Sequence, residues 1–222
     1  MNYNTPMFII KGIIMKKMIL AVVMLLTTNI FADSVHDGYV AFKYKDYDLA
    51  REIWDTSCSQ GNMSACYNVG LIYANGLGTL HNERKAAALF AKVCDSGDAR
   101  ACTNLGALLE NGIGIPRDFY TASKLYYKAC EAGDLDGCYN LAVSYYKGRG
   151  VRRDYKLANA IYEDTCYKGH IYGCYNAARM YKDAKGIERD KSKAKKLFAR
   201  ACNMGHSGAC RKYERLEEEG IK

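Results

Sequence analysis

The sequence predicts an all-α protein, a right-handed α/α solenoid of five disulfide-stapled helix pairs. Ten cysteines recur every 36 residues in five pairs, and the members of each pair lie eight positions apart: Cys58 and Cys66, Cys94 and Cys102, Cys130 and Cys138, Cys166 and Cys174, and Cys202 and Cys210. Such a period is typical of solenoids, in which each unit buries its apolar face against its neighbours. The 222 residues, 49% of them hydrophobic, suffice for one elongated domain with a large core.

The first helix of each unit has a start signal and an apolar stripe. Twelve positions before the first cysteine stands a residue whose side chain can accept hydrogen bonds from the free N–H groups of a first helical turn: Asp46, Asn82, Asp118, Asp154 or Asp190. An alanine recurs eight positions before the cysteine, and large apolar residues recur five and four positions before it. These offsets trace one face of a helix. The only tryptophan, Trp54, belongs to this stripe, so we expect it in the core.

The second cysteine opens another helix in each unit. Small residues four positions later would let a neighbouring helix approach closely: Gly70, Gly106, Ala142 and Ala178. Glycines then follow as helix ends and turns, paired in three units and single in the fourth: Gly76 and Gly78, Gly112 and Gly114, Gly148 and Gly150, and Gly186. Another glycine lies between the paired cysteines, so each pair joins two helices across a short turn that a disulfide can span.

These offsets divide the chain into a solenoid domain over residues 33–222, with units at about 46–81, 82–117, 118–153, 154–189 and 190–222. Residues 35–45 are expected to form a short helix before the first unit. Residues 211–219 (RKYERLEEE) give the last helix a polar outer face, which a capping unit requires.

The first 32 residues have the three parts of a secretory signal peptide, with Lys16 and Lys17, an apolar run and a cleavage point after Ala32. Residues 1–14 are interpreted as an upstream extension, and a membrane anchor over residues 8–31 is the alternative. Ten paired cysteines also favour an oxidising compartment. We therefore expect a bacterial protein that is secreted or periplasmic. Cleavage would lower the net charge from +8 to about +5, because three lysines are lost, and no pattern indicates nucleic-acid binding.

Metal binding is the alternative interpretation of the cysteines. His170 and His206 each stand four positions after a cysteine, which invites a metal site. The equivalent positions in the other units are Asn62, Asp98 and Asp134, which resemble helix N-caps. The sequence therefore predicts structural disulfides, with neither a metal nor a cofactor.

The pattern of the repeated helix pairs resembles a known family. Leu-Gly-x-x-Tyr-like motifs in one helix, an alanine and an aromatic residue in the next, and Gly-x-Gly before an Asp cap are similar to the Sel-one-like repeat (SLR), a relative of the tetratricopeptide repeat. The signal sequence and the eight-residue cysteine spacing narrow the resemblance to the Helicobacter cysteine-rich protein family. That family is classed as β-lactamase, so the resemblance implies penicillin binding and slow hydrolysis as an alternative function.

The residues themselves give little support to a hydrolase. A serine β-lactamase needs Ser-x-x-Lys together with partner motifs. Ser144 with Lys147, and Ser192 with Lys195, match the first element, but the partner motifs Ser-Asp-Asn and Lys-Thr-Gly are absent from the sequence. Ser144 also shares a column with Ile72, which predicts that it faces the core. The catalytic residues, if the protein is an enzyme, are not identified by the sequence.

A recurring asparagine two positions after the second cysteine points instead to binding. It occurs in four units, as Asn68, Asn104, Asn140 and Asn176, and the residues beside it are Tyr67, Thr103, Tyr139 and Tyr175. A carboxamide offers a donor and an acceptor together, so it can pair with any peptide unit. By resemblance to the tetratricopeptide pattern, this helix lines a concave groove that holds an extended peptide. We therefore expect an extended peptide, a cell-wall fragment of the peptidoglycan kind or another protein as partner. The alternative is that these side chains only brace the fold.

Overall fold

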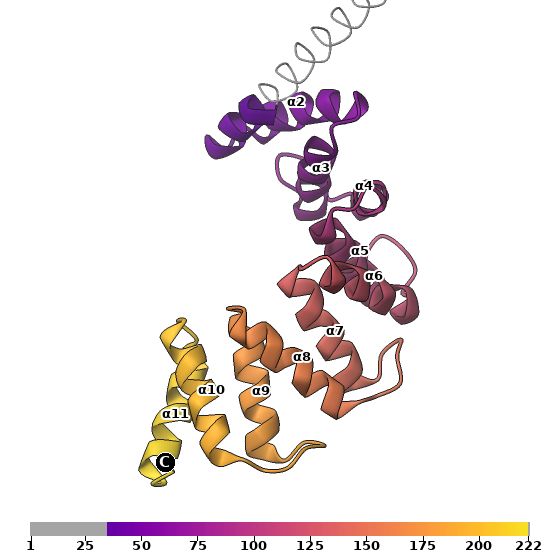
Figure 1. Ribbon diagram of the computed structural model, residues 1–222. Coiled ribbons are helices and arrows are strands. Elements are labelled where there is room, and N and C mark those ends of the chain that lie inside the picture. Colours follow the sequence, from indigo (N-terminus) through magenta and orange to yellow (C-terminus); the bar gives the residue numbers. More distant parts are fainter. Residues whose placement is uncertain (1–34, 222) are drawn as a thin grey trace, which may run out of the picture. The chain divides into compact units, whose positions relative to one another are not determined.

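The computed structural model describes residues 35–221, and within that range the chain is helical and contains no strand (Figure 1). The predicted signal segment, residues 1–32, lies outside the described residues. A helical segment at residues 35–43 precedes ten helices of nearly equal length: α2 (Tyr47–Ser59), α3 (Met63–Asn75), α4 (Glu83–Asp95), α5 (Ala99–Asn111), α6 (Phe119–Glu131), α7 (Leu135–Lys147), α8 (Tyr155–Tyr167), α9 (Ile171–Asp183), α10 (Lys191–Asn203) and α11 (Ser207–Glu218). The prediction of an all-α chain of repeated helix pairs is confirmed.

The described chain divides into two compact units, residues 35–81 and residues 82–221. The first unit holds α2 and α3. Its core includes Trp54, which is 2% exposed and packs against the rings of Tyr39 and Phe42. The indole N–H of Trp54 donates to the carbonyl oxygen of Val35 at 3.1 Å, so the segment at residues 35–43 is fixed to α2.

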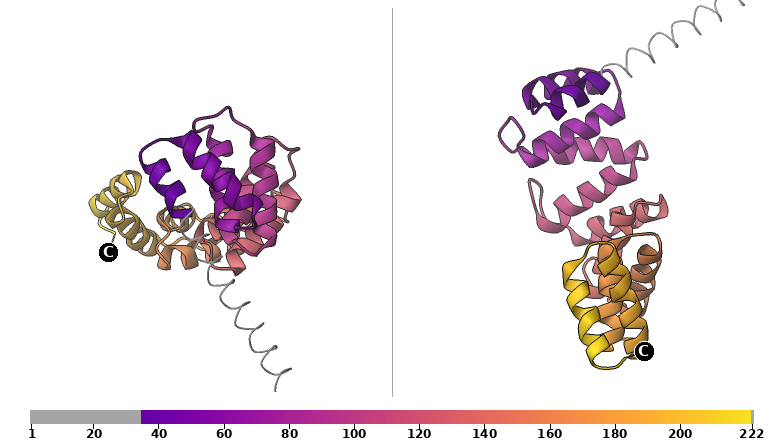
Figure 2. Two further views of the ribbon diagram at one scale, coloured as in Figure 1. Left: turned by 90° about the horizontal axis from the view of Figure 1, so that it is seen from above. Right: turned by 90° about the vertical axis from the view of Figure 1, so that its left-hand side faces the viewer.

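The second unit stacks α4–α11, and each helix packs against the next along the chain (Figure 2). The even-numbered helices, which precede the first cysteine of a pair, are called outer helices, and the odd-numbered helices that follow are called inner helices. The inner helices α5 and α7 also contact each other directly. The alanine column is fully buried at Ala86, Ala158 and Ala194, which confirms the predicted core stripe.

The predicted N-caps are confirmed. All five outer helices begin after the expected Asp or Asn, whose side chain accepts a backbone N–H of the first turn: Asp46, Asn82, Asp118, Asp154 and Asp190. At the other end of the inner helices, Gly76, Gly112 and Gly148 take the left-handed conformation as C-caps. In the fourth unit Ala184 takes this conformation instead, with φ at 53°, and Gly186 follows in the turn.

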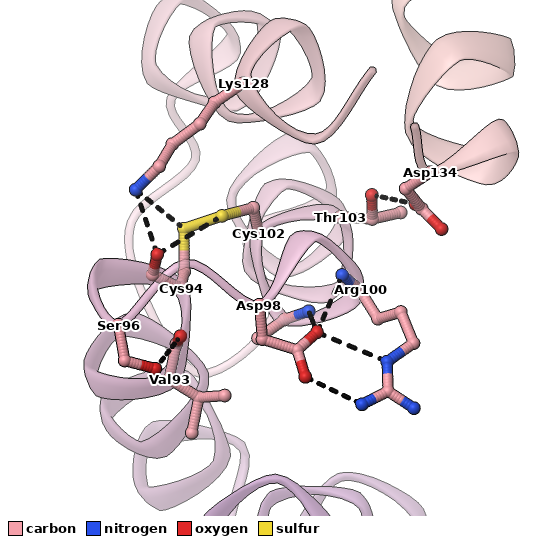
Figure 3. The surroundings of a disulfide bond; sticks show 10 residues. Val93, Cys94, Ser96, Asp98, Arg100, Cys102, Thr103, Lys128 and Asp134 are labelled. Carbon is pink, nitrogen blue, oxygen red and sulfur yellow. Dashed lines mark hydrogen bonds and ion pairs between the residues drawn. A yellow bond between two sulfur atoms is a disulfide. The ribbon is translucent and has the colours of Figure 1, made fainter. Parts of the chain in front are cut away.

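All five predicted disulfides are formed, and each joins the end of an outer helix to the start of the inner helix after it. The Cα atoms of each pair lie 4.4–4.7 Å apart. Figure 3 shows a second device beside the bridge between Cys94 and Cys102, where Lys128 of the next outer helix donates to the carbonyl oxygen of Cys94 at 2.9 Å. Arg200 donates to the carbonyl oxygen of Cys166 in the same way, at 3.2 Å. Cations of one repeat thus cap the helix end of the repeat before.

In the pairs α4–α5, α6–α7 and α8–α9, the end opposite the disulfide is held by a close backbone approach. The turn after α7 contains Gly150 with φ at 69°, and a Cβ atom added there would lie 1.9 Å from the carbonyl oxygen of Phe119, the first residue of α6. Gly114 approaches Glu83 of α4 and Gly186 approaches Tyr155 of α8 in the same register. Only glycine fits these positions, because any side chain would push the turn away from the outer helix.

We expect Gly150→Ala to lower the free energy of unfolding by at least about 3 kcal/mol, because the methyl group adds a clash to the cost of a positive φ. Gly133→Ala is the matched control, since Gly133 also has a positive φ, 89°, but nothing lies within 4 Å of its added Cβ. It should cost only about 1–2 kcal/mol. Urea unfolding of both variants with the disulfides intact measures the difference, and equal losses would show that the close approach contributes nothing.

Candidate binding groove on the inner helices

The second unit carries a groove of about 770 Å³ along its inner helices. Glu110 and Asn111 line it from α5, Tyr139 and Asn140 from α7, and Asn176 from α9. The groove runs across successive inner helices, and asparagine recurs at the same register on α7 and α9. The structure thus brings Asn140, Asn176 and Tyr139 of the predicted ladder together in one hollow.

The two groove asparagines differ in their contacts. Asn176 donates through Nδ2 to the hydroxyl oxygen of Tyr139 at 3.1 Å, so it braces that ring across the two helices. Asn140 is half-buried, and its carboxamide makes no hydrogen bond among the described residues. A groove-lining carboxamide without an internal partner is available to a ligand, whereas Asn176 has both a structural contact and a remaining carbonyl oxygen.

The other ladder residues lie in different surroundings. Asn104 on α5 and Tyr67 on α3 are half-buried and have contacts of their own. Asn68 belongs to the first unit and is only 6% exposed. Its Oδ1 atom lies 3.5 Å from the hydroxyl of Tyr39, and its Nδ2 atom has no hydrogen-bond partner among the described residues. The binding role of the whole ladder stays a prediction.

In the second unit, Thr103, Tyr139 and Tyr175 each contact the N-cap of the next inner helix. Thr103 donates to Oδ2 of the cap Asp134 at 2.6 Å (Figure 3). In the following repeats a tyrosine faces a histidine cap: the ring centroids of Tyr139 and His170 lie 4.7 Å apart, and Tyr175 stacks on His206 at 4.3 Å with an interplanar angle of 13°. His170 and His206 are helix caps, like Asn62, Asp98 and Asp134. Their place in the cap column was visible in the sequence, but their contact with the tyrosines was not.

Positive charge predominates around the groove. Four cations line it, namely Lys147, Arg149, Arg179 and Lys185, against the two carboxylates of Glu110 and Asp183. Both carboxylates are engaged, because Arg149 pairs with Glu110 at 2.9 Å and Lys182 pairs with Asp183 at 2.8 Å. The asparagine column did not predict these cations. Lys147 ends α7, Arg149 and Lys185 lie in turns, and Arg179 lies within α9.

The tyrosines of the groove are neutral hydrogen-bonding groups. Burial raises the pKa of Tyr139, although the hydrogen bond from Asn176 opposes this. Burial also raises the pKa of Tyr162, which lines the same hollow. The pKa of Tyr126 beside it is raised by burial and by the nearby Glu110 carboxylate, to which its hydroxyl donates at 3.0 Å. These rings therefore offer apolar faces and hydroxyl groups rather than acid–base chemistry.

The serine–lysine motifs take part in contacts that serve the fold. Ser144 is 4% exposed, and its hydroxyl donates to the carbonyl oxygen of Asn140 one turn earlier at 3.0 Å. This confirms that it faces the core. Lys195 pairs with Glu217 at 2.5 Å and also donates to the carbonyl oxygen of Ile221. β-Lactam hydrolysis therefore rests on the family resemblance alone.

Residues 35–221 contain neither a candidate membrane-spanning helix nor a cluster of metal ligands. None of the helices there combines the length and the apolar composition that crossing a membrane requires. Nor do three His, Cys, Asp or Glu side chains come together there as a metal site would need.

Comparison with known families identifies the repeat. The model of the Sel1 repeat matches residues 64–98, 99–134, 135–170 and 171–206, well over half of the chain. Each match begins with an inner helix and ends after the outer helix that follows, so the family divides the same helices in a different phase. No match is found among curated proteins.

Solved structures show the same fold. The c5321 protein of uropathogenic Escherichia coli, described as a protective antigen with an SLR fold, is 26% identical with a TM-score of 0.82 over 86% of this chain; the match spans 42% of that protein. A Sel1 repeat protein from Oxalobacter formigenes is 26% identical with a TM-score of 0.77, covering 82% of this chain and 74% of that one. Helicobacter pylori cysteine rich protein B is 27% identical over 62% of this chain and 92% of its own, with a TM-score of 0.45. Membership of the narrower cysteine-rich family stays a prediction.

We expect Ser144→Ala and Ser192→Ala to leave any hydrolysis of a chromogenic cephalosporin unchanged. Ser144→Ala should alter the free energy of unfolding by less than about 1 kcal/mol, because a serine bonded to the preceding turn contributes little to a helix. Ser207→Ala, at the start of α11, is the control. A loss of turnover beyond about a hundredfold in either variant would identify a nucleophile and contradict this interpretation.

Proposed function

The chain belongs to the Sel1 repeat family, and we propose that it is a secreted or periplasmic binding protein that holds an extended acidic peptide in the groove of α5, α7 and α9. Sel1 repeats generally mediate protein–protein interactions. The five disulfides indicate an oxidising compartment outside the cytoplasm. The observation that carries the proposal is the free carboxamide of Asn140 beside cations that lack carboxylate partners.

The amides supply recognition of the peptide backbone. Asn140 can donate to a peptide carbonyl and accept from a peptide N–H, and Asn176 keeps its carbonyl oxygen for a second N–H. Because the two residues are 36 positions apart on neighbouring helices, they favour a ligand that crosses the inner helices in extended form. Such contacts recognise the backbone of the ligand peptide, so selection among ligand side chains depends on the surrounding groups.

The cations of the groove provide selectivity for the side chains of the ligand peptide. Arg149 is neutralised by Glu110, but Lys147, Arg179 and Lys185 pair with no carboxylate among the described residues. Arg179 lies over the ring of Tyr175 at 5.9 Å and Lys185 over the ring of Tyr155 at 5.3 Å, so aromatic faces position their charges. Three uncompensated cations beside two amides favour a peptide with acidic side chains.

The test uses acetylated and amidated ten-residue peptides with no, two or four glutamates, and a matched series with lysines. Affinity should rise with the number of glutamates and fall with added salt, because exposed charges are screened. A cell-wall stem peptide is tested in parallel. If it binds more tightly than the glutamate peptides, the ligand is a cell-wall fragment and not a protein peptide. Absence of binding to every member would overturn the proposal.

We expect Asn140→Ala to weaken binding of the four-glutamate peptide by about 1–3 kcal/mol, because two polar pairs with the backbone are lost. The melting temperature should change by no more than about 1 °C, since Asn140 braces nothing in the fold. Asn203→Ala, an exposed asparagine at the end of the outer helix α10, is the control and should change neither quantity. A fall in melting temperature with unchanged affinity would instead make Asn140 a structural residue.

A further inference from the structure

Two of the inner helices are capped by histidine where the others use asparagine or aspartate. Nδ1 of His170 accepts the backbone N–H of Gly173 at 3.0 Å, and Nδ1 of His206 accepts that of Ala209 at 3.1 Å. A ring nitrogen can accept only when it carries no proton, so each cap requires an unprotonated Nδ1, and the proton of the neutral ring is then on Nε2. For His170 this arrangement fits Oδ1 of Asp136, which lies 3.1 Å from Nε2 and can accept a hydrogen bond from Nε2–H.

The same two imidazoles support Tyr139, which lines the groove, and Tyr175, which lies under the groove cation Arg179. Tyr139 packs on His170, and its hydroxyl accepts the Nδ2–H of the groove residue Asn176. Tyr175 stacks on His206 and also lies under the cation of Arg179. Ring position and cap geometry are therefore coupled, because each imidazole can hold its tyrosine only while it also holds the start of the helix.

We propose that His170 and His206 are acid-sensitive helix caps, and that their protonation releases Tyr139 and Tyr175 and so weakens the groove. A second proton on Nδ1 turns the acceptor into a donor that faces a backbone N–H. The charge then also stands at the positive end of the helix dipole. The imidazole must rotate away from the cap, and the stacked tyrosine loses its support. The consequence for ligand affinity rests on the proposed function.

The neighbours of the two caps predict that protonation costs more free energy at His206 than at His170. His170 faces the Asp136 carboxylate and the Tyr139 ring from α7 and Tyr172 of its own helix, so the carboxylate compensates part of its charge. His206 faces Tyr172 and Tyr175 from α9, and the Arg211 guanidinium of α11 borders the same glycine, Gly208. No carboxylate pairs with His206 among the residues described.

The aspartate caps provide an internal contrast. A hydrogen bond from Arg100 holds the pKa of Asp98 below its usual range despite partial burial, and the Thr121 hydroxyl does the same for Asp118. Those carboxylates stay ionised well below the range of about pH 5–8 in which imidazoles change charge. The histidine caps differ from these two aspartates, because the atom that accepts the backbone N–H is itself the ring nitrogen that takes up the second proton.

The matched variant is His170→Asn combined with His206→Asn, because asparagine caps α3 at Asn62 and does not titrate. Between pH 7.5 and pH 5.5 the wild-type melting temperature should fall by about 4–8 °C, from two lost caps. The double variant should lose less than half as much, and His206→Asn alone should remove more of the loss than His170→Asn. Equal pH dependence in wild type and double variant would overturn the proposal.

A second measurement does not depend on the variants folding. In wild-type protein, ¹⁵N spectra should show Nδ1 of both imidazoles without a proton at pH 7.5, and the ring signals of Tyr139 and Tyr175 should change together with protonation at pH 5.5. Tyrosine signals that stay unchanged while the imidazoles titrate would contradict the release of the rings.

Peptide binding separates this proposal from the proposed function. The four-glutamate peptide should bind wild type about 3–10-fold more weakly at pH 5.5 than at pH 7.5, and the double asparagine variant less than about 2-fold more weakly; glutamate side chains remain largely ionised at both values. Equal weakening in both proteins would overturn the regulation of the groove. If no peptide binds at either pH, the proposed function fails, while the melting and ¹⁵N measurements still decide whether the caps are acid-sensitive.

Discussion

The helix pairs α4–α5, α6–α7 and α8–α9 are each closed at both ends, and the rest of the second unit depends on this closure. At one end the disulfide joins the two helices across the turn between them. At the other end the turn after the inner helix lies against the first residue of the outer helix, where Gly150 meets Phe119 and Gly186 meets Tyr155 without room for a side chain. Both contacts fix the separation of the two helices. Repetition of one separation keeps Asn140 and Asn176 in the same register.

The periodic part of the structure could be predicted because it is set by local chemistry that recurs. An Asp or Asn twelve residues before a cysteine caps a helix in every unit, and two cysteines eight residues apart across a glycine turn favour a local bridge. Burial of Ala158 and Ala194 follows from helical periodicity alone. None of these inferences required knowledge of how one repeat contacts the next.

The site could be predicted only in part, because it is made by contacts between repeats and by exceptions to the pattern. The column of asparagines includes Asn140 and Asn176, which line one hollow, but it did not show that Asn68 is almost fully buried near Tyr39. That burial involves residues 35–43, which have no counterpart in the later repeats. The cations Arg149 and Lys185 were missed because they lie in turns, where one unit differs freely from another.

Local closure also decides what can move. Each bridge closes a short loop and stabilises its own helix pair by about 2–3 kcal/mol, because it restricts the conformations of the unfolded chain. It adds nothing to the contact between helix pairs. That contact depends on buried apolar residues together with polar links such as Lys128 to the carbonyl of Cys94 and Thr103 to Asp134. Helix pairs can therefore shift against one another without breaking a covalent bond. His170 and His206 occupy this same boundary, each capping one inner helix while packing on the tyrosine of the one before. A change of charge there acts on the spacing between pairs, which is the spacing that the groove residues Asn140 and Asn176 share.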